Sequence, residues 1–403
     1  MKKQLLVASV LAAIGMMQAQ AGTLDSGNLS ISGFGTLGVA QSNTDDIQFA
    51  RYNQAVGVMD SPRIGLDSNL GLQASYKFND MLSATAQVLT RKNTSPQFTT
   101  DLTWAFLKLK VNDEISVRAG RVVLPAFTIS DYQNVGYANT MMRPPVEVYG
   151  QMPLEGTDGA DITYQHAFGD TNLTVQGFAG VASGKLFITV GSQTAKYRAP
   201  GYGFAVSAEH GPVTVRVAHL SASLTTHDIV PVNNLVNALS ASGFAQLGRD
   251  IELVDKRVNF NGIGLNLDWN NIVVQTEYTR RRPQDPVYAP ASNSWYLMAG
   301  YRIGKILPYY AHADVRNAAQ SVTVPAALAK APPLAAAVAG LLAPSAQSSN
   351  LIGVRWDFAQ AMALKVQIDR VHPTKKTGAL IFPKAGATIG DVTVIGAALD
   401  FVF

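Results

Sequence analysis

A serine and a histidine that could act together in hydrolysis lie two residues apart, at His219 and Ser221. In nucleophilic catalysis the histidine must come within hydrogen-bonding distance of the serine hydroxyl. On a strand both side chains would point to the same face, but residues two apart are separated by roughly 6.6–6.8 Å. No third catalytic partner is evident, and the other histidines lack the spacing of metal ligands. We therefore predict no catalytic residue, no bound metal and no cofactor.

Residues 33–38 match the glycine-rich pattern G-x-G-x-x-G of dinucleotide-binding proteins. That pattern binds a dinucleotide only where it leads from a strand into a helix. Here the three glycines lie inside an alternating segment with no helix after it. We predict instead that they ease strand curvature or allow close contact at a trimer interface. Asp45 and Asp46, in the loop that follows, are interpreted as a solvated acidic pair rather than a calcium site.

Charged side chains recur on one face of short alternating segments. In the segment that starts at Ile272, the even-numbered residues as far as Tyr278 form a mainly apolar face, and the odd-numbered face carries Glu277 and Arg281. Residues of like parity share a face of a strand, so one face meets lipid and the other meets water. The inward-facing charges that we assign to the wall of a lumen are Arg216, Glu277, Arg281, Arg302, Arg355 and Asp357.

Short and long connections alternate along the chain. Seven very short ones lie at 79–80, 112–113, 169–170, 211–212, 270–271, 304–305 and 359–360, and six contain the residues that tight turns favour. Eight longer stretches lie at roughly 40–61, 92–101, 122–158, 182–201, 222–258, 283–293, 317–350 and 372–389. Strict alternation of seven turns with eight loops predicts sixteen strands and is typical of transmembrane β-barrels.

Composition favours a wall with lipid outside and water inside. Charged residues make up 15% of the 403 residues, there is no cysteine, and no apolar run reaches the length of about 20 residues that spans a bilayer. Backbone groups in lipid must be hydrogen-bonded within the protein, so a spanning wall is helical or a closed barrel. We predict an all-β fold, a sixteen-stranded antiparallel transmembrane barrel that occupies residues 22–403 as a single domain. A soluble β-sandwich is the alternative.

The N-terminal residues 1–21 have the features of a cleaved signal peptide. Lys2 and Lys3 precede an apolar run from Leu5 to Met17, and Ala19-Gln20-Ala21 fits the cleavage pattern. The apolar run is too short for a membrane anchor, which is the alternative interpretation. These features predict export from a bacterial cytoplasm.

The C-terminal segment alternates from Ile389 to Phe403 and ends on phenylalanine. In this it resembles the outer-membrane β-barrels of Gram-negative bacteria, whose last strand closes the barrel and carries the assembly signal. The resemblance implies an outer-membrane location, contact with lipid and lipopolysaccharide, and recognition of Phe403 by the barrel-assembly machinery. It also implies that the last strand pairs with the first, near Leu29 to Val39.

The long stretch 122–158 is rich in proline and aromatic residues. With it, the mature chain resembles the general trimeric porins, above all the pseudomonad and betaproteobacterial ones. The resemblance implies a homotrimer and a third loop that folds into the lumen, where loop acids face wall arginines across the narrowest point. The acids would be Asp131, Glu147, Glu155 and Asp158, the facing bases Arg63, Arg91 and Arg118, and Arg143 lies on the same loop. The enteric signature Pro-Glu-Phe-Gly-Gly is absent, and residues 144–150 stand in its place; an external lid is the alternative for this loop.

The predicted function is a porin that passes small hydrophilic solutes and ions by passive diffusion. The sequence does not give the sign of ion selectivity, because that depends on charges at the narrowest point. A substrate-specific channel for organic acids, sugars or phosphate is one alternative, and a barrel enzyme such as a phospholipase is another. The apolar stretches 229–248 and 322–345 are predicted to form short helices over the external mouth or against a neighbouring protomer.

Overall fold

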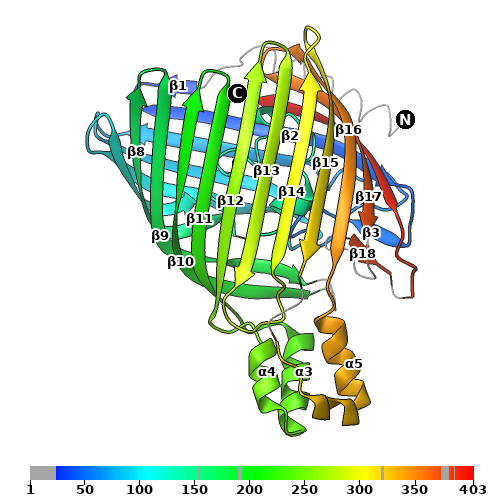
Figure 1. Ribbon diagram of the computed structural model, residues 1–403. Coiled ribbons are helices and arrows are strands. Elements are labelled where there is room, and N and C mark those ends of the chain that lie inside the picture. Colours follow the sequence, from blue (N-terminus) through cyan, green and yellow to red (C-terminus); the bar gives the residue numbers. More distant parts are fainter. Residues whose placement is uncertain (1–23, 153, 189–192, 319–321, 374–380, 385) are drawn as a thin grey trace.

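Long antiparallel strands form a closed barrel in the computed structural model, which describes residues 24–403 except 153, 189–192, 319–321, 374–380 and 385 (Figure 1). Within those residues, sixteen strands make up the wall. They are β2 (Leu29–Ser42), β4 (Asn69–Lys77), β5 (Leu82–Lys92), β6 (Phe98–Lys110), β7 (Ile115–Val123), β8 (Gly156–Phe168), β9 (Thr171–Ile188), β10 (Gln193–His210), β11 (Val213–Thr226), β12 (Lys256–Trp269), β13 (Ile272–Pro283), β14 (Ser292–Tyr301), β15 (Ile306–Asn317), β16 (Ala346–Ala359), β17 (Met362–Pro373) and β19 (Val392–Val402). The predicted strand number is confirmed, and the predicted signal peptide lies outside the described residues.

Three short strands accompany the wall. They are β1 (Leu24–Ser26), which pairs with the start of β2, and β3 (Ile47–Phe49) and β18 (Ile381–Pro383), which pair with each other. The pairing of β3 with β18 joins the first and last long loops over an apolar cluster that includes Val58, Val371 and Val394.

The barrel closes where β19 pairs with β2 along its whole length, from Val394 opposite Ser42 to Val402 opposite Phe34. The backbone of Phe403 continues this ladder by exchanging two hydrogen bonds with Gly33, of 2.8 and 2.9 Å. The predicted pairing of the last strand with the first is therefore confirmed.

The glycines of residues 33–38 have a packing role at this seam that the sequence did not reveal. A Cβ atom on Gly33 would lie 2.3 Å from the ring of Phe403, and one on Gly35 would lie 2.4 Å from the ring of Phe401. The two rings stack with centroids 6.5 Å apart. The glycines are thus required because aromatic rings of the neighbouring strand lie directly over them.

All seven predicted short turns are present between paired strands. Gly169, Gly211, Asn270 and Gly304 adopt positive φ in four of them, as tight hairpin turns require. The turn between β16 and β17 has no such residue, and Ala361 adopts a φ of 59° there. Alanine in this region is strained, since its Cβ crowds the backbone.

One predicted loop is wrong: residues 182–201 are mostly strand. β9 and β10 pair without interruption from Ile188 opposite Gln193 down to Thr171 opposite His210. The inward residues here include Ala182, Gly184 and Ala199. Because the inner face carries small apolar residues instead of polar ones, the alternation was not visible in the sequence.

The outer face of the wall is apolar, as the parity of the strands predicted. Ile263, Trp295 and Ile352 are exposed on it, whereas Val273 and Glu277 are buried on the inner face. A closed barrel with an apolar outside also excludes the soluble sandwich, in which two separate sheets bury their apolar faces against each other.

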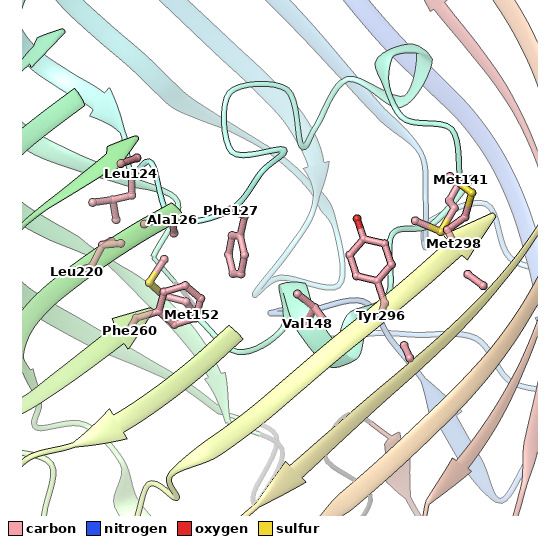
Figure 2. Close-up of a cluster of buried hydrophobic side chains, with 14 of the residues drawn as sticks. Leu124, Ala126, Phe127, Met141, Val148, Met152, Leu220, Phe260, Tyr296 and Met298 are labelled. Carbon is pink, nitrogen blue, oxygen red and sulfur yellow. The ribbon is translucent and has the colours of Figure 1, made fainter. Parts of the chain in front are cut away.

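The inner face of one half of the barrel is apolar in part, which corrects the expectation of a polar lumen throughout. Strands β9 to β16 contribute an inward set of buried apolar side chains that includes Phe178, Leu220, Phe260, Met298 and Tyr309. These side chains form one cluster with residues of the long segment between β7 and β8 (Figure 2). The inner loop therefore occupies part of that half of the lumen, and cavities of about 190 and 340 Å³ remain there.

The two apolar stretches outside the wall form helices, as predicted. α3 (Val230–Ala241) and α4 (Ala245–Ile251) follow β11, and the 3₁₀ helix η2 (Ala326–Lys330) and α5 (Pro332–Leu341) follow β15. The helices lie together beyond one end of the barrel (Figure 1), around a cluster that includes Leu239, Leu247 and Val338. Among the described residues, no helix is long and apolar enough to cross a membrane.

Replacing Gly35 by alanine should weaken the closing seam. The new methyl group would overlap the Phe401 ring, and overpacking of this kind costs about 1–3 kcal/mol of unfolding free energy. Urea unfolding of the refolded protein in detergent measures the loss. Gly340→Ala in α5 is the matched control, because nothing lies within 4 Å of the added atom and alanine favours a helix by roughly 0.5–1 kcal/mol. Equal midpoints for the two variants would contradict the role of Gly35.

Candidate functional site

The segment from 124 to 155, here called the inner loop, leaves the wall after β7 and returns to it at β8. It contains a 3₁₀ turn, η1 (Gly136–Ala138), and one helical turn, α2 (Val146–Tyr149). α2 contacts β13, β14, β15 and β16, which lie across the barrel from β7. Figure 2 shows the loop running past the inner ends of Tyr296 and Met298. The loop therefore lies inside the barrel, and the alternative of an external lid is excluded.

Apolar side chains hold the first and last parts of the inner loop against the wall. Phe127 packs edge-on against Phe260 and against Tyr149, with ring centroids 5.2 and 5.1 Å apart. Val148 and Met141 are buried in the same cluster. Aromatic pairs of this geometry contribute about 0.5–1.5 kcal/mol beyond the burial of their area.

Arg143 anchors the middle of the inner loop through charge. Its guanidinium donates hydrogen bonds of 2.9 and 3.0 Å to the two carboxylate oxygens of Asp67, and another to Asp369 on β17. The Arg143 side chain is only 2% exposed. Burial alone would lower its pKa, but the two carboxylates raise the pKa of Arg143 overall. Arg143 therefore binds the loop to the wall and does not face the open lumen.

Two cations of the wall, Lys365 and Arg355, donate hydrogen bonds to backbone carbonyls of the inner loop. Lys365 on β17 donates to the carbonyl oxygens of Gly136 and Asn139, at 2.7 and 2.5 Å, and forms an ion pair with Asp400. Arg355 donates to the carbonyls of Tyr137 and Asn139. A Cβ on Gly136 would lie 2.2 Å from a carboxylate oxygen of Asp400, so only glycine allows the loop to approach so closely.

Glu147 is also an anchor. It is 1% exposed and accepts hydrogen bonds from Gln347 Nε2, at 2.6 Å, and from the Ser349 hydroxyl, both on β16. Burial raises the pKa of Glu147, although the two donors counteract part of this effect. A buried carboxyl with fixed partners cannot bind a passing ion, so the prediction of Glu147 as a facing acid does not fit this position.

Open space remains on the other side of the inner loop, between its residues 131–135 and the wall of β5 to β9. This cavity measures about 400 Å³ and is lined by charged side chains. Arg91 on β5 donates to Glu155 at 2.6 Å and to Asn134 at 3.0 Å. Arg121 on β7 pairs with Asp158 on β8 at 2.7 Å. Asp131, predicted as a loop acid, lines the cavity and is exposed.

Two of the predicted facing bases lie elsewhere. Arg63 is in the loop between β2 and β4, where it bridges to Ala40 and donates weakly to the carbonyl of Gly57. Arg118 forms a bidentate pair with Asp161 on the neighbouring strand. Of the three bases that we predicted, only Arg91 meets an acid of the inner loop among the contacts of the described residues.

The predicted wall charges are mostly engaged in local pairs. Arg302 pairs with Asp268 and Arg355 with Asp357, each at 2.8 Å. Glu277 accepts hydrogen bonds from loop residues Thr128 and Tyr149, Arg216 donates to Ser207, and Arg281 donates to the carbonyls of Gln151 and Pro290. Local pairing stiffens the wall. The pairs of Arg302 with Asp268 and of Arg355 with Asp357 also line another opening, of about 340 Å³, beside residues 137–140 of the inner loop.

Arg121 was missed by the sequence analysis for a physical reason. It is three residues from Arg118, so a regular strand would place the two on opposite faces. The β7–β8 ladder runs through Gly120 without a register shift and pairs Arg121 with Asp158, so Arg121 lies on the face opposite Arg118, yet it lines the same cavity as Arg91. Lys185 and Asp101, which also line it, lie on segments that we interpreted as loops.

Comparisons with known proteins agree on the fold. No protein-family model matches this chain, and no curated protein matches its sequence. Among solved structures, OmpT of Vibrio cholerae is 12% identical with a TM-score of 0.54, covering 95% of this chain and 100% of that one. The anion-selective porin from Comamonas acidovorans is 13% identical with a TM-score of 0.52, covering 93% and 99%. OmpF of Salmonella typhi, in a complex with daunomycin, is 14% identical with a TM-score of 0.53, covering 94% and 98%. The chain thus shares the barrel fold of outer-membrane proteins that include a porin.

Removing the charge of Arg143 should release the inner loop. Arg143→Met leaves Asp369 buried without a cation and Asp67 with only Arg51, 3.8 Å away, and breaking a buried pair in this way costs about 3–5 kcal/mol. We expect faster cleavage by chymotrypsin at Phe127 and Tyr149, measured on the refolded protein. Arg370→Met is the control, because the exposed pair of Arg370 with Asp391 contributes at most about 1 kcal/mol. Equal cleavage rates for the two variants would show that Arg143 does not hold the loop.

Proposed function

We propose that this protein is an outer-membrane porin that forms a water-filled channel for passive diffusion of small hydrophilic solutes and ions. The observation that carries the proposal is the charged cavity between the inner loop and the wall of β5 to β9. An apolar outer face supports insertion in lipid, and a closed ladder leaves no unpaired strand edge to face the lipid along the closing seam.

The charges that line the cavity suit a channel with modest selectivity. Arg91 and Glu155 compensate each other, as do Arg121 and Asp158, so neither sign dominates the field. Mobile ions and polar solutes are stabilised by such mixed charges without being held. No bond needs to be made or broken, and we propose that the protein is not an enzyme.

The cellular setting belongs to the same proposal. Residues 1–21 would direct export, Phe403 would be read by the barrel-assembly machinery, and the mature barrel would lie among outer-membrane lipid and lipopolysaccharide. One similar structure, OmpT of Vibrio cholerae, is described in a trimer form, which supports a homotrimer here. We also propose that, among porins, this protein is related to those of pseudomonads and betaproteobacteria.

A phospholipase-type site at His219 is not supported. Its ring nitrogen Nδ1 lies 2.8 Å from the side-chain oxygen of Asn261 on β12, rather than beside Ser221. Both residues lie on the outer face of β11, where no carboxylate contacts His219 among the described residues.

Single-channel recording in planar bilayers tests the proposal. Purified protein should insert and give an ohmic current, and the reversal potential in a salt gradient should be small because charges of both signs line the cavity. Repeated insertion without current would refute a porin.

The variants Arg91→Gln and Glu155→Gln should shift ion selectivity in opposite directions. The first leaves Glu155 without its cation and favours cations, whereas the second leaves Arg91 and favours anions. A unit charge about 4 Å from a passing ion contributes about 1 kcal/mol in water, which corresponds to about a fivefold change in the permeability ratio. Arg249→Gln, on α4 outside the barrel, removes the same charge and should leave the ratio unchanged. Shifts of the same sign in both cavity variants would place the ion path elsewhere.

A further inference from the structure

A mainly apolar cavity lies on the other side of the inner loop from the charged cavity beside Arg91. It measures about 190 Å³ and shares no lining residue with the charged cavity. Its walls are Phe178, Leu220 and Phe260 from β9, β11 and β12, and Met152 and Leu154 from the inner loop. Phe178, Leu220 and Phe260 are buried on the inner face of the wall, whereas Tyr202, which also lines the cavity, is exposed on the outer face. An apolar cavity of about 150 Å³ is enough to hold benzene.

Two polar groups lie at one end of this cavity. Among the described residues that line it, Arg281 is the only charged one. Its guanidinium donates to the backbone carbonyls of Gln151 and Pro290, and no carboxylate of the described residues pairs with it. A guanidinium has five N–H donors, and three are used here, so two are available to a further acceptor.

Gln151 supplies the second polar group. It is 4% exposed, its side-chain nitrogen donates to the carbonyl of Glu147, and its Oε1 accepts no hydrogen bond although it is buried. A buried acceptor without a partner costs about 1–3 kcal/mol, which a hydroxyl donor on a ligand would recover but a carboxylate, which only accepts, would not.

We propose that this cavity binds a small aromatic carboxylate, with the ring among the apolar side chains and the carboxylate on Arg281. The absence of any acidic residue from the lining favours an anion over a cation. The ring excludes water from the cavity, and Arg281 then acts in a low-dielectric setting where a charge-assisted hydrogen bond is strong. The site is separate from the ion path, so a ligand can be held while ions pass.

Calorimetric titration of the refolded full chain in detergent, with an empty-micelle blank, tests this site. Benzoate should bind saturably at one site per chain. Acetate carries the charge without the ring. It should bind about 10- to 100-fold more weakly than benzoate, because it buries no aromatic surface in the cavity. Benzyl alcohol carries the ring and a donor for Gln151 but no charge. It should bind at least about tenfold more weakly than benzoate.

Two variants separate the ring from the charge. Arg281→Gln should weaken benzoate about 10- to 100-fold and leave benzyl alcohol unchanged, because only the charge-assisted bond is lost. Ala222→Leu fills the cavity from β11 and should abolish binding of both. Arg249→Gln, on the outer helix α4, is the charge-matched control and should bind benzoate like the parent protein.

Single-channel current recorded on the same preparations distinguishes the two proposals. Protein that conducts but binds benzoate no better than acetate would overturn the aromatic site and leave the porin intact. Equal benzoate binding in the parent, Arg281→Gln and Ala222→Leu proteins would also overturn it. Benzoate binding in protein that never conducts would support the aromatic site and refute the porin.

Discussion

The pairing of β19 with β2 is the interaction on which the rest of the structure depends. It turns a sheet with two free edges into a ring, so that each wall strand has hydrogen-bonded neighbours on both sides. The seam is made tight by the rings of Phe401 and Phe403, which lie over the glycines at 33 and 35. Closure also creates the enclosed inner face of the barrel, and the inner loop packs against that face.

The inner loop divides the inside of the barrel into two regions of different chemistry. Its apolar side chains pack on apolar residues of the inner face of β9 to β16, and Glu147 of α2 accepts hydrogen bonds from Gln347 and Ser349 on β16. Buried charges then fix its position, with Arg143 between two carboxylates and Lys365 on two loop carbonyls. The opposite side of the loop faces β5 to β9 across a cavity lined by paired charges. The proposed ion path and the proposed aromatic site are therefore consequences of one packing arrangement.

The sequence predicted the fold well because a barrel leaves a periodic signature. Turn residues such as Gly169 and Asn270 and the alternation around Ile272 gave the strand number and the two faces. The prediction failed where the pattern was hidden by packing. Residues 182–201 are strand with a small apolar inner face, and the inner face of β9 to β16 carries apolar side chains where a distant loop covers it.

The functional residues were harder to predict than the fold. Strand parity shows which charges point inward, but not which of them are covered by a loop that is far away in sequence. Arg143 and Glu147 were expected at the constriction, yet both are buried anchors. Their burial could not be predicted because their partners Asp369 and Ser349 lie more than 200 residues later in the chain. Arg121 was missed because strand parity places it on the face opposite Arg118.

Modification of single introduced cysteines during current recording tests the central claim most directly, because the chain has no cysteine of its own. A cysteine at Asp131 lines the charged cavity, whereas one at Met141 is buried between the inner loop and the wall. A membrane-impermeant thiol reagent should change the current through the Asp131→Cys protein at once and leave that of the Met141→Cys protein unaltered. Modification of Met141→Cys with no effect at Asp131→Cys would show that the ion path runs along the other side of the loop, and would contradict the account.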